Sequence, residues 1–139
     1  MTDSPDLGAA LLMGLGGGLR SFAPPVALAV HGRGPLTGRA RFVVFGVAAA
    51  ELVADKLPSM PSRWSVRGMS GRLVFSAGAG RVLGGGPGAA VAAAAAVGAA
   101  FAGSRLRMMV HEPRRQIAAA VAEDALSYAL VLAATASLS

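Results

Sequence analysis

Long apolar runs, separated by short basic or glycine- and proline-rich segments, form the main pattern of the chain. Residues 82–104 are 23 consecutive uncharged residues, and a helix needs about 20 to cross a bilayer. Apolar runs at 42–57 and 116–138 predict two more helices, and each run carries a pair of acidic residues. The pattern therefore predicts an all-α, polytopic membrane helix bundle, with residues 1–139 as a single membrane domain.

The first apolar stretch is too short to form one regular span. Leu7–Leu19 has 13 residues, or about 20 Å of helix, and Val26–Val30 is shorter still. Two prolines between them cannot continue a helix but suit the first turn of a new one. One long kinked span and two half-helices both fit this pattern, and the lengths favour the half-helices. The break is predicted at Ser21, Pro24 and Pro25.

A similar order of elements recurs in the second half of the chain. The short apolar piece Ser70–Gly80 is followed by a glycine cluster, where Gly86 and Pro87 predict a second break, and a helix then continues to about Gly103. In both halves a broken segment precedes a basic loop and an acidic helix. We therefore expect a weak inverted repeat with halves 7–57 and 70–138, an arrangement typical of transporters.

Composition supports a membrane protein and excludes several other classes. The chain is 54% hydrophobic and only 14% charged, against about 25% charged in soluble domains. Its net charge is +6, but the arginines lie in short loops, where they set topology, so nucleic-acid binding is not expected. The density of arginine at 105–115 favours the cytoplasm for that loop. With no cysteine and no Ser/His/Asp constellation, we expect no enzyme activity, metal or cofactor.

The acidic pairs, Glu51 with Asp55 and Glu123 with Asp124, are the candidate chemistry. A bare carboxylate inside a membrane is costly, so each must be protonated, paired or facing water. Such a group can carry a proton or a cation. The alternative is a structural role, in which a carboxylate pairs with an arginine and locks the bundle.

Arg20 and Arg81 adjoin the two predicted breaks. The N-terminus of a half-helix presents unsatisfied N–H groups, and arginine adds a forked donor, which together suit an anion. Each arginine could instead extend to the lipid headgroups. We expect Glu51 and Glu123 to meet Arg20 in one polar centre. The candidate substrate- or ion-binding residues are Glu51, Glu123, Arg20, Asp55, Asp124 and Arg81.

Three segments carry a family resemblance: Gly18–Pro25 (GLRSFAPP), Glu51–Arg63 (ELVADKLPSMPSR) and Glu123–Leu126 (EDAL). With them, the chain resembles the small bacterial membrane proteins known as domain of unknown function 4126. The resemblance implies a location in the bacterial inner membrane and supplies no activity. Gly14–Arg20 is also similar to the opening of the small fluoride channels, although their Asn-bearing helix and Thr-Thr-Phe-Ser break are missing here.

These observations favour a small proton- or ion-coupled transporter or a related lipid-handling protein, acting on a small ion or an anionic substrate. A small ion channel, a dimer like the fluoride channels, is one alternative, and a membrane-embedded structural or interaction subunit is another. Because 139 residues enclose little volume, we expect a homodimer. A water-filled cavity at Glu51 would support transport or conduction, and a dry ion pair would support the structural role.

Overall fold

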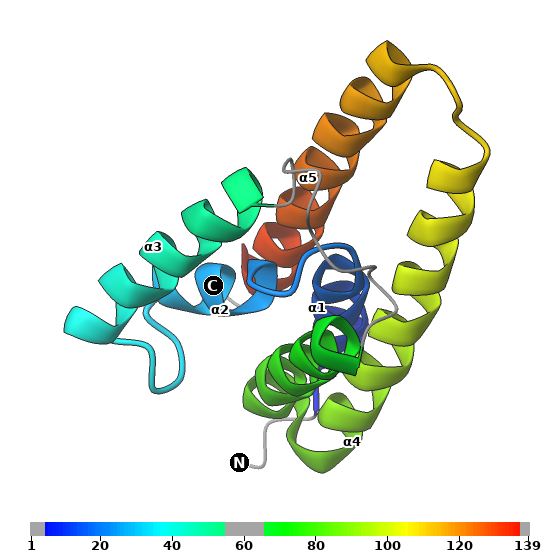
Figure 1. Ribbon diagram of the computed structural model, residues 1–139. Helices are drawn as coiled ribbons and strands as arrows, with labels where there is room; N and C mark the ends of the chain where they lie inside the picture. The colour runs from blue at the N-terminus through cyan, green and yellow to red at the C-terminus, as the bar shows by residue number, and fades with distance from the viewer. Residues whose placement is uncertain (1–4, 55–65, 137–139) are drawn as a thin grey trace.

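The computed structural model describes residues 5–54 and 66–136, and every regular element in those ranges is a helix (Figure 1). This agrees with the predicted all-α class. The helices in chain order are α1 (Leu7–Leu19), α2 (Ala23–Val30), α3 (Arg39–Ala54), α4 (Val66–Met108) and α5 (Pro113–Ala136).

The predicted interruption between the first two helices is present. Backbone at Arg20 is extended, at φ −137° and ψ 121°, and its N–H closes α1 on the carbonyl of Gly16. Pro24 and Pro25 occupy the first turn of α2, where a missing N–H leaves no hydrogen bond unmade. A Cβ on Gly17 would stand 2.8 Å from Pro24 Cγ, so α2 begins against the last turn of α1. The two short helices are therefore separate elements rather than one kinked span.

The second break lies slightly earlier than predicted. Gly84 and Gly85, not Gly86 and Pro87, have the non-helical backbone within α4. Gly85 adopts φ 62° and ψ −149°, a conformation that is essentially restricted to glycine. Pro87 follows in the first turn of the second limb, where proline is tolerated. The break thus falls where the backbone needs a residue without a Cβ.

This hinge reverses the chain, so that the two limbs of α4, residues 66–83 and 86–108, contact each other. A Cβ on Gly80 would come within 2.4 Å of the carbonyl oxygen of Gly88, and one on Gly88 within 2.3 Å of that of Gly80. Gly84 does not share this close approach, since its nearest neighbour would be at 3.5 Å.

Helix α1 lies at the centre of the bundle, and its glycines allow other helices to approach it closely. A Cβ added to Gly14 would stand 2.3 Å from the carbonyl oxygen of Ala92, and one added to Gly18 would stand 2.3 Å from that of Ala96. Because both helices advance by four residues between these contacts, α1 runs parallel to the second limb of α4. Small residues allow helices to approach closely, and the small-residue face of that limb packs on α1 of the same chain.

The other faces of α1 are covered by α5 and by the first limb of α4. Gly16 faces Val131 and Ser127 of α5, and the Ser127 hydroxyl donates to the Gly16 carbonyl at 2.8 Å. Gly17 faces Ser76 on the first limb of α4. Helix α3 stands at the edge of the bundle (Figure 1), and within the described residues α2 is the helix it packs on.

Two helices, α4 over Gly68–Met108 and α5, are long and apolar enough to cross a membrane. In the most apolar 18-residue stretch of each helix, only 28% of the residues in α4 and 17% of those in α5 are buried inside the bundle. Large apolar side chains on these two helices and on α3 face outward. They include Phe42, Val43, Val53, Val74, Phe101, Ile117 and Leu126.

Candidate functional site: the charged centre at the helix break

The break between α1 and α2 places Arg20 inside the bundle. Its side chain is only 2% exposed, and it forms an ion pair with Asp124 of α5. Arg20 Nε donates to Asp124 Oδ1 at 2.5 Å, and Nη2 contacts the same oxygen. Two groups of opposite charge thus hold the centre of α5 against the end of α1.

Glu51 of α3 completes the centre from the other side. Its two carboxylate oxygens accept hydrogen bonds from the backbone N–H groups of Ser21 and Phe22, each at 3.2 Å. These N–H groups stand at the start of α2, where a helix leaves donors unsatisfied and carries partial positive charge. Glu51 is therefore the resident anion of a helix N-terminus that adjoins Arg20.

Tyr128, one turn after Asp124 on α5, belongs to the same neighbourhood. Its half-buried phenol lies within electrostatic reach of Glu51, Arg20 and Asp124. On the far side of the break, the rings of Phe22 and Phe75 pack with centroids 4.7 Å apart. Residues from α1, α3 and α5 thus form a polar centre bounded by an aromatic contact with α4. We call Arg20, Glu51, Asp124 and Tyr128 the break centre.

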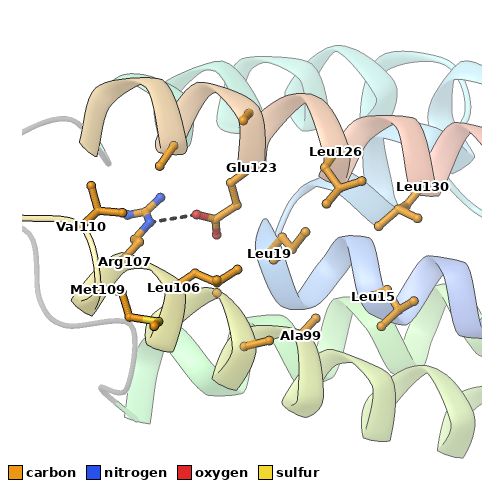
Figure 2. A pocket seen from close by; sticks show the side chains of 14 residues that line it. Leu15, Leu19, Ala99, Leu106, Arg107, Met109, Val110, Glu123, Leu126 and Leu130 are labelled. Atoms are coloured by element: carbon orange, nitrogen blue, oxygen red, sulfur yellow. Dashed lines mark hydrogen bonds and ion pairs between the residues drawn. The ribbon is translucent and has the colours of Figure 1, made fainter. Parts of the chain in front are cut away.

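The predicted polar centre of Glu51, Glu123 and Arg20 is only partly right. The carboxylate paired with Arg20 belongs to Asp124, whereas Glu123 accepts from Arg107 Nε at 2.8 Å (Figure 2). Adjacent residues on a helix point about 100° apart, so one register position decides which carboxylate faces α1. The two acidic residues of α5 therefore serve two different arginines.

Three of the other predicted site residues, Arg81, Gly86 and Pro87, are not brought to the break centre. Arg81 is exposed on the first limb of α4. Gly86 and Pro87 lie at the α4 hinge, beside Gly85. Asp55 lies outside the described residues.

Three polar residues at or near these charged groups were not predicted for the site. Arg107 pairs with Glu123, and Tyr128 faces the break centre. Arg72, on the limb of α4 beside the break, is 6% exposed and donates to the Gly68 carbonyl of its own helix at 3.4 Å. Tyr128 had a signal in the sequence, because it follows Asp124 by four residues and so shares its helix face. Nothing in the sequence distinguished Arg107 from its neighbouring arginines.

Comparisons with family models, with curated proteins and with solved structures found no match. The resemblance to the domain of unknown function 4126 therefore stays a prediction, and the function must be argued from the site. Chemically, the break centre offers two carboxylates that can take up a proton, one arginine and one phenol. It also offers two backbone N–H donors that bind an anion.

Proposed function

We propose that this chain is a multi-pass protein of the bacterial inner membrane. The low burial of the apolar residues in α4 and α5 supports the proposal, because an apolar core helix of a soluble protein would be mostly covered. The small-residue contacts of α1 are of the kind that hold helices together in lipid. A bilayer would cover the outward-facing apolar side chains, including Phe42 and Phe101.

Within that membrane, α1 and α2 would be a re-entrant pair whose turn lies deep in the bundle. Asp6 lies beside Gly84, and Gly34 beside Val82, so both ends of the pair are near the α4 hinge. The 13 residues of α1 place Arg20 about 20 Å from that end. Irregular backbone at such a depth is tolerated where it is buried in protein or lines a cavity, and it is a frequent site of ion and substrate binding in transporters.

We infer that the break centre is the binding site of a proton-coupled anion transporter. The observation that carries this proposal is the carboxylate of Glu51 bound to two N–H groups beside Arg20. A carboxylate in that place supports the idea that the donors suit an anion of similar size. A proton on Glu51 would remove its charge and weaken both hydrogen bonds, and an incoming anion could then replace it. Proton and anion would bind together and move in the same direction.

In this mechanism Asp124 has a different role from Glu51. It neutralises Arg20 and fixes its guanidinium, so that the arginine is oriented toward the break when the anion arrives. Tyr128 supplies a hydroxyl that can donate to the anion or relay the proton. Because one chain encloses little volume, we propose that the transporter works as a homodimer.

A structural role is the second candidate, and one observation favours it. Arg20 is almost fully buried and its partner Asp124 is 15% exposed, which describes a nearly dry ion pair. In that case the break centre would hold the helices together without moving any ion, and the chain would act as a membrane-embedded subunit for another protein.

Flux and stability measured on the same variants distinguish the two candidates. The full chain is reconstituted in vesicles, and uptake of fluoride, chloride, phosphate and acetate is followed with and without an imposed pH gradient. For the transporter, wild type accumulates one of these anions in response to the gradient. Glu51→Gln keeps its melting temperature within a few degrees but loses the response, and the exposed Glu112→Gln is the matched control with normal flux. Absence of flux in wild type, with clear destabilisation in Glu51→Gln, would establish the structural role instead.

A further inference from the structure

A second site, separate from the break centre, lies between the second limb of α4 and α5. These helices leave a groove of about 680 Å³, within the 300–1,000 Å³ range of small-molecule sites. Figure 2 shows leucines from three helices along it, with Leu15 of α1 and Leu130 of α5 at one end and Leu19 of α1 near the middle. Of the 14 residues that line it, only Arg107 and Glu123 are charged.

The two charged residues lie together at the end of the groove nearest the α4–α5 turn. Arg107 from α4 and Glu123 from α5 point toward each other there (Figure 2). The Arg107 side chain is 32% exposed and that of Glu123 only 10%, so Arg107 is the more accessible member of the pair, although its Nη2 is itself buried. The bond through Nε fixes the guanidinium plane at the mouth of the groove. The site therefore has a long apolar part and one oriented cationic end.

The surroundings of this end are strongly basic. Residues 105–115 carry four arginines and one glutamate, and Arg105 lies with its guanidinium 5.0 Å from the ring centre of Phe101. Basic pockets between helices at the cytoplasmic surface of a membrane bind anionic lipid headgroups. A second copy related by a two-fold axis through this face would bring two arginine-rich turns together, which disfavours it as the occupant.

We propose that the groove is a binding site for an anionic phospholipid, with an acyl chain along the apolar part and the phosphate at Arg107. The phosphate receives charge-assisted hydrogen bonds from the guanidinium, while Glu123 keeps that guanidinium in place. The small side chains of Ala99, Ala102 and Ala122 leave the space that the chain fills. The site is lateral, open to the bilayer, and does not depend on any ion moving through the break centre.

The test measures which lipids stay bound to the full chain. Protein reconstituted in an equimolar mixture of phosphatidylglycerol and phosphatidylcholine is extracted gently, and the retained lipids are quantified by mass spectrometry. Wild type is expected to retain phosphatidylglycerol in preference. Arg107→Gln should reduce that preference about tenfold, the effect of losing one charge-assisted contact. Arg81→Gln, an exposed arginine on the first limb of α4 that does not line the groove, is the matched control and should keep the preference.

A second variant tests the acyl-chain part without changing any charge. Ala122→Phe fills the groove and should lower the amount of retained lipid, and glycerol 3-phosphate, which has no acyl chain, should not raise the melting temperature of wild type. Equal retention of both lipids by wild type would overturn the proposal. So would equal effects of Arg107→Gln and Arg81→Gln, or cross-linking that shows a second copy seated in the groove.

Discussion

Arg20 and Asp124 are 104 residues apart in the sequence and form an ion pair in the centre of the bundle, with Arg20 Nε 2.5 Å from Asp124 Oδ1. The pair joins the end of α1 to the middle of α5. Because α1 stops at this point, the break is spanned by a single-turn hydrogen bond from the Ala23 N–H to the Arg20 carbonyl at 3.3 Å, and side chains help to fix the position of α2. Arg20 does so toward α5, and Glu51 does so toward α3.

Removing the charge of Asp124 should therefore destabilise the fold. Asp124→Asn leaves a buried guanidinium without its counter-charge, a loss of 3–5 kcal/mol in fully dry pairs. Arg20 has further contacts and Asp124 is slightly exposed, so we expect about 3 kcal/mol. Reversible unfolding in mixed micelles measures it.

The adjacent residue provides the control for this prediction. Glu123→Gln removes the same charge one position earlier, but its partner Arg107 is one-third exposed and stays solvated. Its loss of stability should be clearly smaller. If the two variants were equally destabilised, the assignment of Asp124 as the carboxylate that holds Arg20 would be wrong.

The extent to which sequence predicts this structure can be judged at the break centre. Pro24-Pro25 and the short length of Leu7–Leu19 were enough to predict the break, because proline geometry and bilayer thickness are local constraints. The choice between Glu123 and Asp124 was not predictable in the same way. It depends on how α5 is rotated against α1, which is set by the contact of Gly16 with Ser127 and Val131.

The same limit applies to the α4 hinge and to the groove. A cluster of glycines ending in proline indicated a break, but which glycine takes the positive φ depends on where the two limbs meet at Gly80 and Gly88. The groove is lined by residues of α1, α4 and α5, and no single residue encodes how these three helices are arranged. The expected inverted repeat stays a prediction. The two corresponding helices differ in length, because α2 has 8 residues, whereas its counterpart, the second limb of α4, is far longer.

Close packing of α1 on α4 should make Gly18 intolerant of even one methyl group. A Cβ there would stand 2.3 Å from the carbonyl oxygen of Ala96, so Gly18→Ala must push two backbones apart, at a cost of about 2 kcal/mol. The expected readout is a lower melting temperature. Gly98→Ala, on the second limb of α4 with nothing within 4 Å, should be neutral or stabilising by up to about 1 kcal/mol. Equal tolerance at both positions would contradict the parallel packing of α1 on this limb.

The α4 hinge offers a second matched pair of glycines. Gly85 has φ 62° and ψ −149°, so Gly85→Ala is strained however much space surrounds it, by about 2 kcal/mol. Gly86 also has nothing within 4 Å and no positive φ, so Gly86→Ala should leave stability nearly unchanged. Unfolding of both variants in the same detergent gives the comparison. A stable Gly85→Ala protein would indicate that the two limbs are joined by a different backbone conformation.

The two ends of the second limb of α4 should lie on opposite sides of the membrane. Gly34 lies in the loop before α3, and a Cβ added to it would stand 3.4 Å from Val82 Cγ2. This loop therefore adjoins the α4 hinge. The other end of the second limb lies 23 residues further along, or about 35 Å away. The loop at Thr37 and the turn at His111 should therefore face opposite sides of the membrane, with the arginine-rich turn in the cytoplasm.

The absence of cysteine from the chain makes this prediction straightforward to test. Single-cysteine variants Thr37→Cys and His111→Cys are treated in intact cells with a membrane-impermeant maleimide, before and after permeabilisation. We expect Thr37→Cys to react in intact cells and His111→Cys only after permeabilisation, while the buried Ser127→Cys reacts in neither case. Labelling of both exposed positions from the same side would exclude a membrane crossing by the second limb of α4, and with it the depth assigned to Arg20.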